Sequence, residues 1–145
     1  MNKPRRAARE LALNILYQVD VAGIPLDDAV ATAFEFATAS DEVKDYAKIL
    51  AAGTREHMAA TDAATAALSP DWPPDRQPAV DRNIIRMAMF EMDHMDSVPP
   101  IVSVDEAVEL AKKYSTEDSG KFVNGVLAAF LRLRSIPEVK ASGKG

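Results

Sequence analysis

The residues with the most obvious potential for chemistry are the two histidines, His57 and His94. Glu91 precedes His94 by three positions, the spacing that places a carboxylate and an imidazole on one helix face in di-iron bundles. Such a centre needs a second pair of this kind and two further inward carboxylates, and no glutamate stands three positions before His57. We therefore interpret Glu91 and His94 as a polar helix end, and we expect neither a metal site nor a catalytic residue.

The other common catalytic and cofactor-binding patterns are also missing from the sequence. The chain contains no cysteine, so disulfides, thiolate metal ligands and a cysteine nucleophile are excluded. It has no GxGxxG, no Walker-type phosphate loop, no HExxH and no GxSxG. These absences predict a protein that is not an enzyme and that uses no cofactor.

The strongest candidate for binding chemistry is KPRRAARELALNILYQ, residues 3–18. This stretch sets four basic residues against a single acid, in a chain whose formal net charge is −5. Cations in the first turn of a helix oppose the positive end of its dipole, so a functional demand would explain their presence. Guanidinium groups beside the Tyr17 ring suit single-stranded RNA, through phosphate contacts and base stacking. The plainer alternative is a solvated helix start with Tyr17 buried against a second bundle; the basic residues are Lys3, Arg5, Arg6 and Arg9.

A second candidate patch is STEDSGKFVNG, residues 115–125. We expect Asp118 or Ser119 to cap a helix there, with Lys121 in its first turn. The free backbone N–H groups of such a helix start attract phosphate oxygens, which makes it a candidate phosphate site. The alternative is an ordinary capped helix with Phe122 in the core.

The elements that must position these residues are predicted to be helices. Alanine, leucine and charged helix formers dominate and glycine is scarce, so we expect an all-α fold. Apolar spacing in the first helix predicts a buried face around Ala8 and Ile15, and it places Arg6 and Tyr17 on a separate sector with Arg9 between the two. Seven helices are expected. The first two cover about residues 4–20 and 27–38, the third begins after its cap Ser40, and the other four cover about 62–68, 79–95, 103–114 and 118–134.

Two further features organise the chain. Ser103 and Glu106 have the spacing of a capping box, in which each side chain satisfies a free backbone N–H at a helix start. Four prolines in residues 69–78 predict a loop that divides the chain into halves. We therefore expect two packed helical bundles, about 4–68 and 79–134, in one domain over 1–135, followed by a flexible tail at 136–145.

Bulk composition is that of a globular protein, with 145 residues of which 48% are apolar and 27% charged. The longest uninterrupted apolar run covers residues 126–131, whereas about 20 residues are needed to cross a bilayer. No apolar segment follows the basic N-terminus before Glu10, so a secretory signal is not expected. These features predict a cytoplasmic protein.

Three stretches resemble the NusB family of transcription antitermination factors. RRAARELALNILYQ resembles the opening helix of the family, VDRNIIRMAMFEM its central helix, and VPPIVSVDEAVELAKKYSTEDSGKFVNGVL a family signature. The resemblance spans residues 5–134 and implies a non-enzymatic fold of two three-helix bundles. It also implies binding of the boxA element in ribosomal RNA leader transcripts together with NusE, a small-subunit ribosomal protein. The complex would then join NusA, NusG and RNA polymerase to suppress termination.

The resemblance implies residue roles as well. The NusE contact would involve the central helix, where Asp81 is expected to be exposed, with Glu91 as a further acid on that surface. Some members of the family self-associate through the basic face, so a homodimer is also implied. The RNA surface would comprise Lys3, Arg5, Arg6, Arg9, Tyr17, Asp118, Ser119, Lys121 and Phe122.

Two other classes of function stay open at this point. The same helical fold serves as the RNA-binding module of a ribosomal RNA cytosine methyltransferase, although this chain has no glycine-rich nucleotide loop and no cysteine nucleophile. Alternatively, the module binds only proteins, and its basic helix serves a homodimer or the NusE contact.

Overall fold

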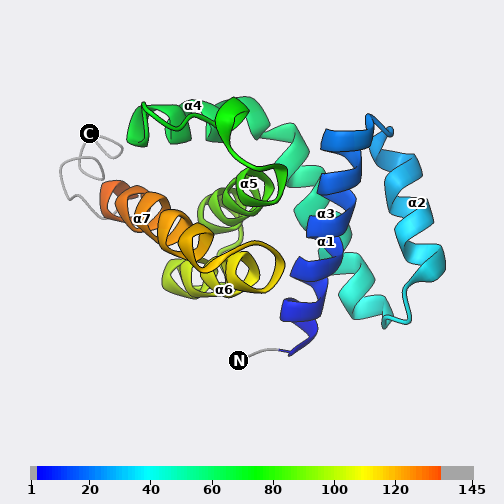
Figure 1. The fold of residues 1–145 in the computed structure, drawn as a ribbon. Helices are drawn as coiled ribbons and strands as arrows, with labels where there is room; N and C mark the ends of the chain where they lie inside the picture. The colour runs from blue at the N-terminus through cyan, green and yellow to red at the C-terminus, as the bar shows by residue number, and fades with distance from the viewer. Residues whose placement is uncertain (1–2, 135–145) are drawn as a thin grey trace, which may run out of the picture.

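The computed structural model describes residues 3–134, and within them the chain is all-α, as expected (Figure 1). The expected tail at 136–145 lies outside the described residues. No helix in the described part is long and apolar enough to span a membrane. The elements are α1 (Lys3–Ala22), α2 (Leu26–Phe36), α3 (Asp41–Glu56), α4 (Met58–Leu68), the 3₁₀ turn η1 (Pro74–Arg76), α5 (Ala79–His94), α6 (Pro100–Tyr114) and α7 (Glu117–Arg134).

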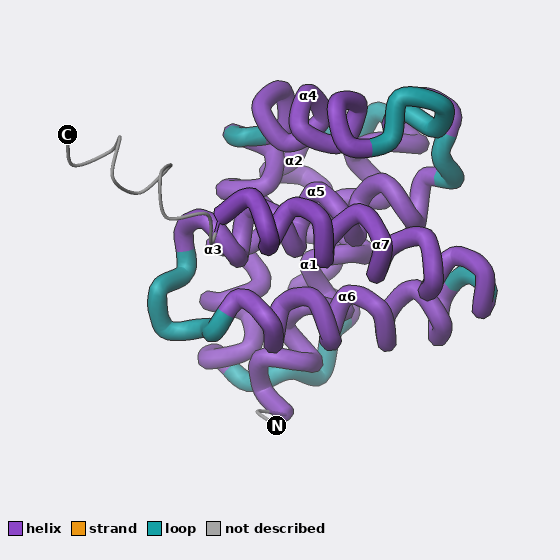
Figure 2. The backbone as a smooth tube through the Cα atoms, turned by 90° about the vertical axis from the view of Figure 1, so that its left-hand side faces the viewer, coloured by secondary structure: helices purple, strands orange, loops and turns teal. Residues whose placement is uncertain are grey.

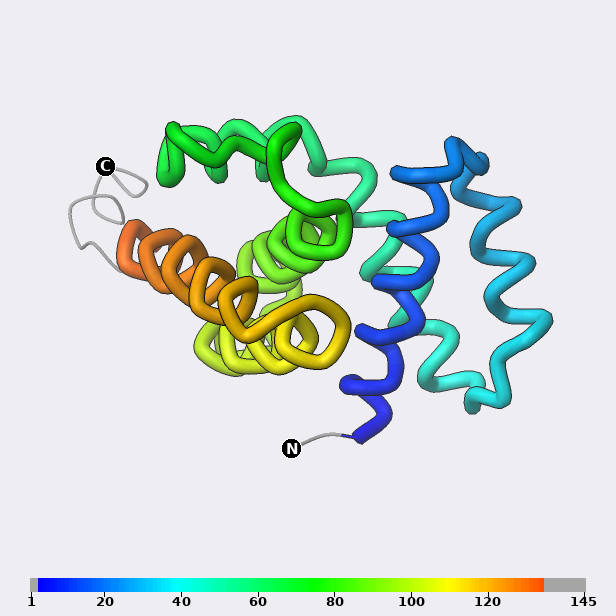
Figure 3. Tube along the Cα trace, viewed as in Figure 1, coloured from blue at the N-terminus to red at the C-terminus, as the bar shows by residue number. Residues whose placement is uncertain are grey.

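The helices pack in two groups, and α1 of the first group contacts α5 of the second. Helices α1, α2 and α3 pack on one another, and α5, α6 and α7 form the second group. Helix α1 lies against α5 as well as α3, and α3 also contacts α5, so the two groups form one continuous core (Figure 3). Helix α1 therefore has buried sides toward both groups.

The sequence had led us to expect helix α4 in the N-terminal group, but the structure places it with the C-terminal group. It packs mainly against α5 and α7, and Figure 2 shows it lying above them. The crossing from one group to the other occurs at the α3–α4 junction around His57, not at the proline-rich loop of residues 69–78. The expected boundary after residue 68 is therefore wrong as a description of the packing.

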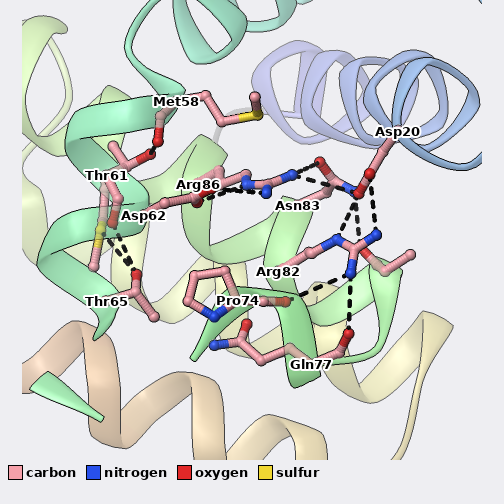
Figure 4. Close-up of polar contacts among 12 residues, drawn as sticks. Asp20, Met58, Thr61, Asp62, Thr65, Pro74, Gln77, Arg82, Asn83 and Arg86 are labelled. Atoms are coloured by element: carbon pink, nitrogen blue, oxygen red, sulfur yellow. Dashed lines mark hydrogen bonds and ion pairs between the residues drawn. The ribbon is translucent and has the colours of Figure 1, made fainter. Parts of the chain in front are cut away.

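A network of ion pairs holds the end of α1, α4 and the proline-rich loop onto α5 (Figure 4). Arg82 donates to Asp20 through Nε and Nη2, at 2.6 and 3.0 Å, and its Nη1 reaches the Gln77 carbonyl oxygen at 3.3 Å. Arg86 forms a bidentate pair with Asp62 at 2.8 and 2.9 Å. The loop therefore follows a fixed path along α5.

Local signals explain most helix ends, but two of the expected caps are different. Ser40 caps α3 as expected, because its hydroxyl accepts from the Val43 N–H at 3.2 Å. Helix α6 begins at Pro100, so the expected capping box at Ser103 and Glu106 lies inside the helix. Proline at the first position needs no N–H partner and has a helical φ, and this starts the helix one turn earlier. At α7, Thr116 accepts from the backbone N–H at position 119, so neither Asp118 nor Ser119 is the cap.

Candidate nucleic-acid interface

The basic residues at the start of α1 are divided between the surface and the interior. Lys3 is exposed, Arg5 is half-buried, and the Arg6 side chain is 51% exposed. Arg9, however, is 4% exposed and points between the two groups of helices. The expectation that Arg9 presents its guanidinium on an RNA-facing surface is therefore wrong.

Arg9 is buried because it pairs with Glu91 of α5, which is 2% exposed. Its Nε lies 3.1 and 3.0 Å from the two carboxylate oxygens of Glu91, and its Nη2 lies 3.0 Å from one of them. Tyr46 and Ser103 donate to the same carboxylate, each at 2.6 Å. Burial, and then the hydrogen bond to Glu91, raise the pKa of Tyr46. This cluster joins α1, α3, α5 and α6, so Glu91 has a structural role and is not available on a partner surface.

Arg6 is also paired, but at the surface. Its Nε and Nη2 donate to the two carboxylate oxygens of Glu106 at 2.9 and 2.7 Å. These hydrogen bonds lower the pKa of Glu106 and raise that of Arg6. Nη1 of Arg9 lies 3.8 Å from Glu106 Oε1 and has no hydrogen-bond partner, although it is buried. Glu106 thus lies between an exposed guanidinium and a buried one.

Asp81 is not exposed, which contradicts its expected role as an acidic contact on the central helix. It is 3% exposed, and its Oδ2 accepts from the Ser119 hydroxyl at 2.7 Å. Ser119 is itself buried and lies 2.9 and 3.1 Å from the hydroxyls of Ser115 and Thr116. This contact fixes the start of α7 against the start of α5.

The two candidate patches are brought to one face of the molecule by α6. Lys113 of α6 pairs with Glu10 of α1 at 2.8 Å, and Tyr17 and Tyr114 line one groove of about 240 Å³ between these helices. Val80 lines the same groove beside the Asp81–Ser119 contact, so the α7 start lies next to it. On that start Asp118 and Lys121 are exposed and Phe122 is half-buried.

Tyr114 is the residue at this face that the sequence analysis missed. Tyr114 is 46% exposed and Tyr17 is 37% exposed, so the groove offers two aromatic side chains. Lys113 lies 5.3 Å from the centre of the Tyr114 ring. The available signal was the KKY sequence at the end of the helix, where two cations precede an aromatic ring.

Glu91 and His94 do not form a metal-binding pair. The Glu91 carboxylate faces the Arg9 cluster, whereas the His94 ring stacks on Phe90 with centroids 5.0 Å apart and lies tilted against the His57 ring at 4.2 Å. No group of three or more His, Asp or Glu side chains within residues 3–134 is placed to hold a metal ion.

A model of the NusB family matches residues 6–132. This chain belongs to the NusB family. The transcription antitermination protein NusB of Pelotomaculum thermopropionicum is 46% identical to it over 123 residues, which are 85% of each chain. The corresponding protein of Anaeromyxobacter dehalogenans is 47% identical over 128 residues, covering 88% of this chain and 89% of the relative. The resemblance seen in the sequence is thus confirmed, and NusB proteins are antitermination factors, not enzymes.

Solved NusB structures have the same fold. T. maritima NusB superposes with a TM-score of 0.79 at 32% identity, over 89% of this chain and 91% of the other. A complex of the antitermination factors NusB and NusE with double-stranded RNA gives a TM-score of 0.83 at 30% identity, over 92% and 99% of the two chains. The NusB fold of this chain is therefore established by both sequence and structure.

Proposed function

We propose that this protein is an RNA-binding transcription antitermination factor that binds boxA of ribosomal RNA leader transcripts together with NusE. In the larger complex it acts with NusA, NusG and RNA polymerase to suppress termination. The observation that carries this proposal is membership of the NusB family at 46% identity over 85% of the chain. A relative of the same fold has been solved with NusE and RNA, which supports both partners.

The RNA surface that we propose is the face between α1, α6 and the start of α7. Lys3 and Arg6 would contact phosphates there, with Tyr17 available for base stacking. Arg5 would add a contact at the adjoining side of α1, where its guanidinium lies 4.2 Å from the centre of the Tyr46 ring and donates to Ser97 Oγ at 3.2 Å. Asp118, Lys121 and Phe122 would extend this surface along α7. Arg9 and Ser119 act through their neighbours, since both are buried.

Arg6 can present its Nε and Nη2 together to a phosphate only if it exchanges its Glu106 carboxylate for the RNA. A buried carboxylate left without a partner would make this exchange costly. The unpartnered Nη1 of Arg9, 3.8 Å from Glu106, removes that obstacle because a shift of about 1 Å brings it within hydrogen-bond distance. We therefore propose that Glu106 passes from Arg6 to Arg9 when RNA binds.

The proposed contact with NusE needs other residues than Asp81 and Glu91, since both carboxylates are buried in contacts within the chain. We expect the NusE contact among exposed residues beside the RNA surface, because NusE and RNA could then bind this protein side by side. A homodimer through the basic face would compete with RNA for Arg6 and Lys3.

The test is a titration of labelled boxA RNA into the protein with and without NusE, over a range of salt concentrations. With three or four phosphates neutralised, log K should fall against log[salt] with a slope of about −2 to −3. Arg6→Ala should raise Kd about fivefold and flatten this slope by about 0.7. Arg76→Ala, on the exposed loop turn η1, is the matched control and should change neither.

Equal effects of Arg6→Ala and Arg76→Ala, or no salt dependence, would refute the proposed surface. The pairing of Arg6 and Arg9 with acids of this chain favours one alternative, a module that binds only proteins. Binding of NusE without any gain in RNA affinity would support that alternative.

A further inference from the structure

The side of α1 that faces α2 carries a second groove, remote from the start of the basic helix. It has a volume of about 460 Å³ and is lined by apolar side chains of both helices, with Asn14 and Gln18 along the α1 edge. Phe36, at the end of α2, is 79% exposed and lines the groove. The principal apolar lining residues are Leu11, Ile24, Ala29, Ala33 and Phe36.

Packing within the chain does not account for this surface. Ala29 is the one residue of α2 that is fully buried, and the helix packs on α1 and α3 by one side only. Figure 1 shows α2 at the edge of the molecule, with α1 between it and α6. Phe36 contributes little to the core in this position, so its exposed ring is free to contact another molecule.

The rim of the groove is acidic. Asp28, Thr32 and Glu35 recur at i, i+4 and i+7, and Thr32 lines the groove, so the two exposed carboxylates lie along the same edge. Residues 23–43 contain five acids and no basic residue. None of these acids forms an ion pair within the part of the chain that the structure describes. An RNA backbone would be repelled by such a rim, whereas a cationic segment would be attracted.

We propose that this groove is a docking site for a basic amphipathic helix of a protein partner. From Ala29 to Ala37 the α2 side of the groove is about 12 Å long, which matches two helical turns. Apolar side chains at i, i+4 and i+7 of the partner fill the groove beside Phe36, and its lysines or arginines pair with Asp28 and Glu35. An apolar anchor with complementary charge at the rim is the usual basis of such interfaces.

The position of the groove makes it compatible with RNA on the other side of α1. Asn14 and Gln18 line both this groove and the Tyr17–Tyr114 groove, so α1 forms the ridge between them (Figure 3). A protein helix on the α2 side and RNA on the α6 side would lie next to each other without sharing the basic residues. The inference does not depend on RNA binding, since it rests on the shape and charge of the α1–α2 side alone.

The test uses a synthetic 14-residue helical peptide with leucines on one face and lysines elsewhere. A peptide of the same composition, with its leucines scattered around the helix, is the control ligand. Titration into the isotopically labelled full chain should shift the amide resonances of Leu11, Ile24 and Phe36 with the amphipathic peptide only. Phe36→Ala should weaken its binding about tenfold, and Asp28→Lys with Glu35→Lys by at least as much at low salt.

Matched control variants are Trp72→Ala, an exposed aromatic residue elsewhere, and Glu56→Lys with Asp71→Lys, an exposed acidic pair elsewhere. Neither should change peptide affinity. Equal binding of both peptides, shifts spread over other acidic surfaces, or no loss with Phe36→Ala would overturn the proposal. Mapping on the unsubstituted chain decides the question even if a variant fails to fold. Phe36→Ala should leave boxA affinity unchanged, so failure here is distinguishable from failure of the RNA proposal.

Discussion

Replacing Arg9 by methionine tests whether this arginine is a structural residue or an RNA contact. Glu91, 2% exposed, would keep the hydrogen bonds from Tyr46 and Ser103 but lose the Arg9 guanidinium, which lies 3.0 Å from it. Removal of one partner of a buried ion pair costs about 3–5 kcal/mol, because the other charge is left uncompensated. An exposed arginine, by contrast, would change stability by about 0.5 kcal/mol or less.

The assay is equilibrium unfolding in urea, read by circular dichroism. We expect Arg9→Met to lower the midpoint with an unchanged m-value, since the surface exposed on unfolding is the same. The double variant Arg9→Met, Glu91→Gln should recover about half of the loss. Tyr46 and Ser103 donate to different oxygens of Glu91, so the Gln amide oxygen still accepts from one of them while its NH2 group can donate to the hydroxyl oxygen of the other, and no charge is left at this position.

A loss below about 1 kcal/mol for Arg9→Met would refute the assignment of Arg9 to the interior. A double variant that is less stable than Arg9→Met would refute the electrostatic explanation, because it would show that packing of the Arg9 side chain dominates.

Three further outcomes follow from the same contacts. Glu106→Gln should raise the affinity for boxA RNA several-fold in a binding titration, because Arg6 is released from its carboxylate; an unchanged affinity would contradict the exchange. Gly53→Ala should destabilise the protein by about 1–3 kcal/mol in urea unfolding, since a Cβ there would lie 2.0 Å from the Phe90 ring; wild-type stability would show that the ring can move. Stability should fall as the pH drops below about 4.5, because the pKa of Glu106 is lowered from 4.5 in the folded state; its stabilisation is fully present above that pH and is lost as the pH falls through the lower pKa of the folded state. The same holds for Asp20: burial raises its pKa, but the hydrogen bonds from Arg82 and Asn83 and the charges of the two arginines together outweigh burial and lower the pKa from 3.8, so thermal melts of Asp20→Asn should depend less on pH.

The existence and order of the helices could be predicted because apolar spacing and local stop signals determine them within a few residues. Gly23, which follows α1 with φ +69°, is one such local signal. The cap of α3 at Ser40 was predicted correctly for the same reason. The start of α6 was predicted incorrectly, because Pro100 and the capping-box spacing at Ser103 are competing local signals. The Ser103 hydroxyl does not cap the helix but donates a hydrogen bond to Glu91.

The burial of Arg9 and Asp81 could not be predicted from helical periodicity. A helix wheel identifies one apolar face, but α1 is buried on two sides, and the second is partly polar. The partner of Arg9 stands 82 positions along the chain, and that of Asp81 stands 38 positions along. Neither pairing has a local signal. The one hint is that Glu91 follows a nearly continuous apolar run, where an acid needs a cation to be buried.

The buried Arg9–Glu91 pair connects the interior to the surface on which the proposed function depends. It joins α1 to α5 and α6, and so it fixes the rotation of α1 about its own axis. That rotation decides which residues of α1 face α6, where Arg6 and Tyr17 lie, and which face α2. A buried arginine can therefore determine where the groups of the proposed RNA surface point, because a helix that turned about its axis would move both grooves together.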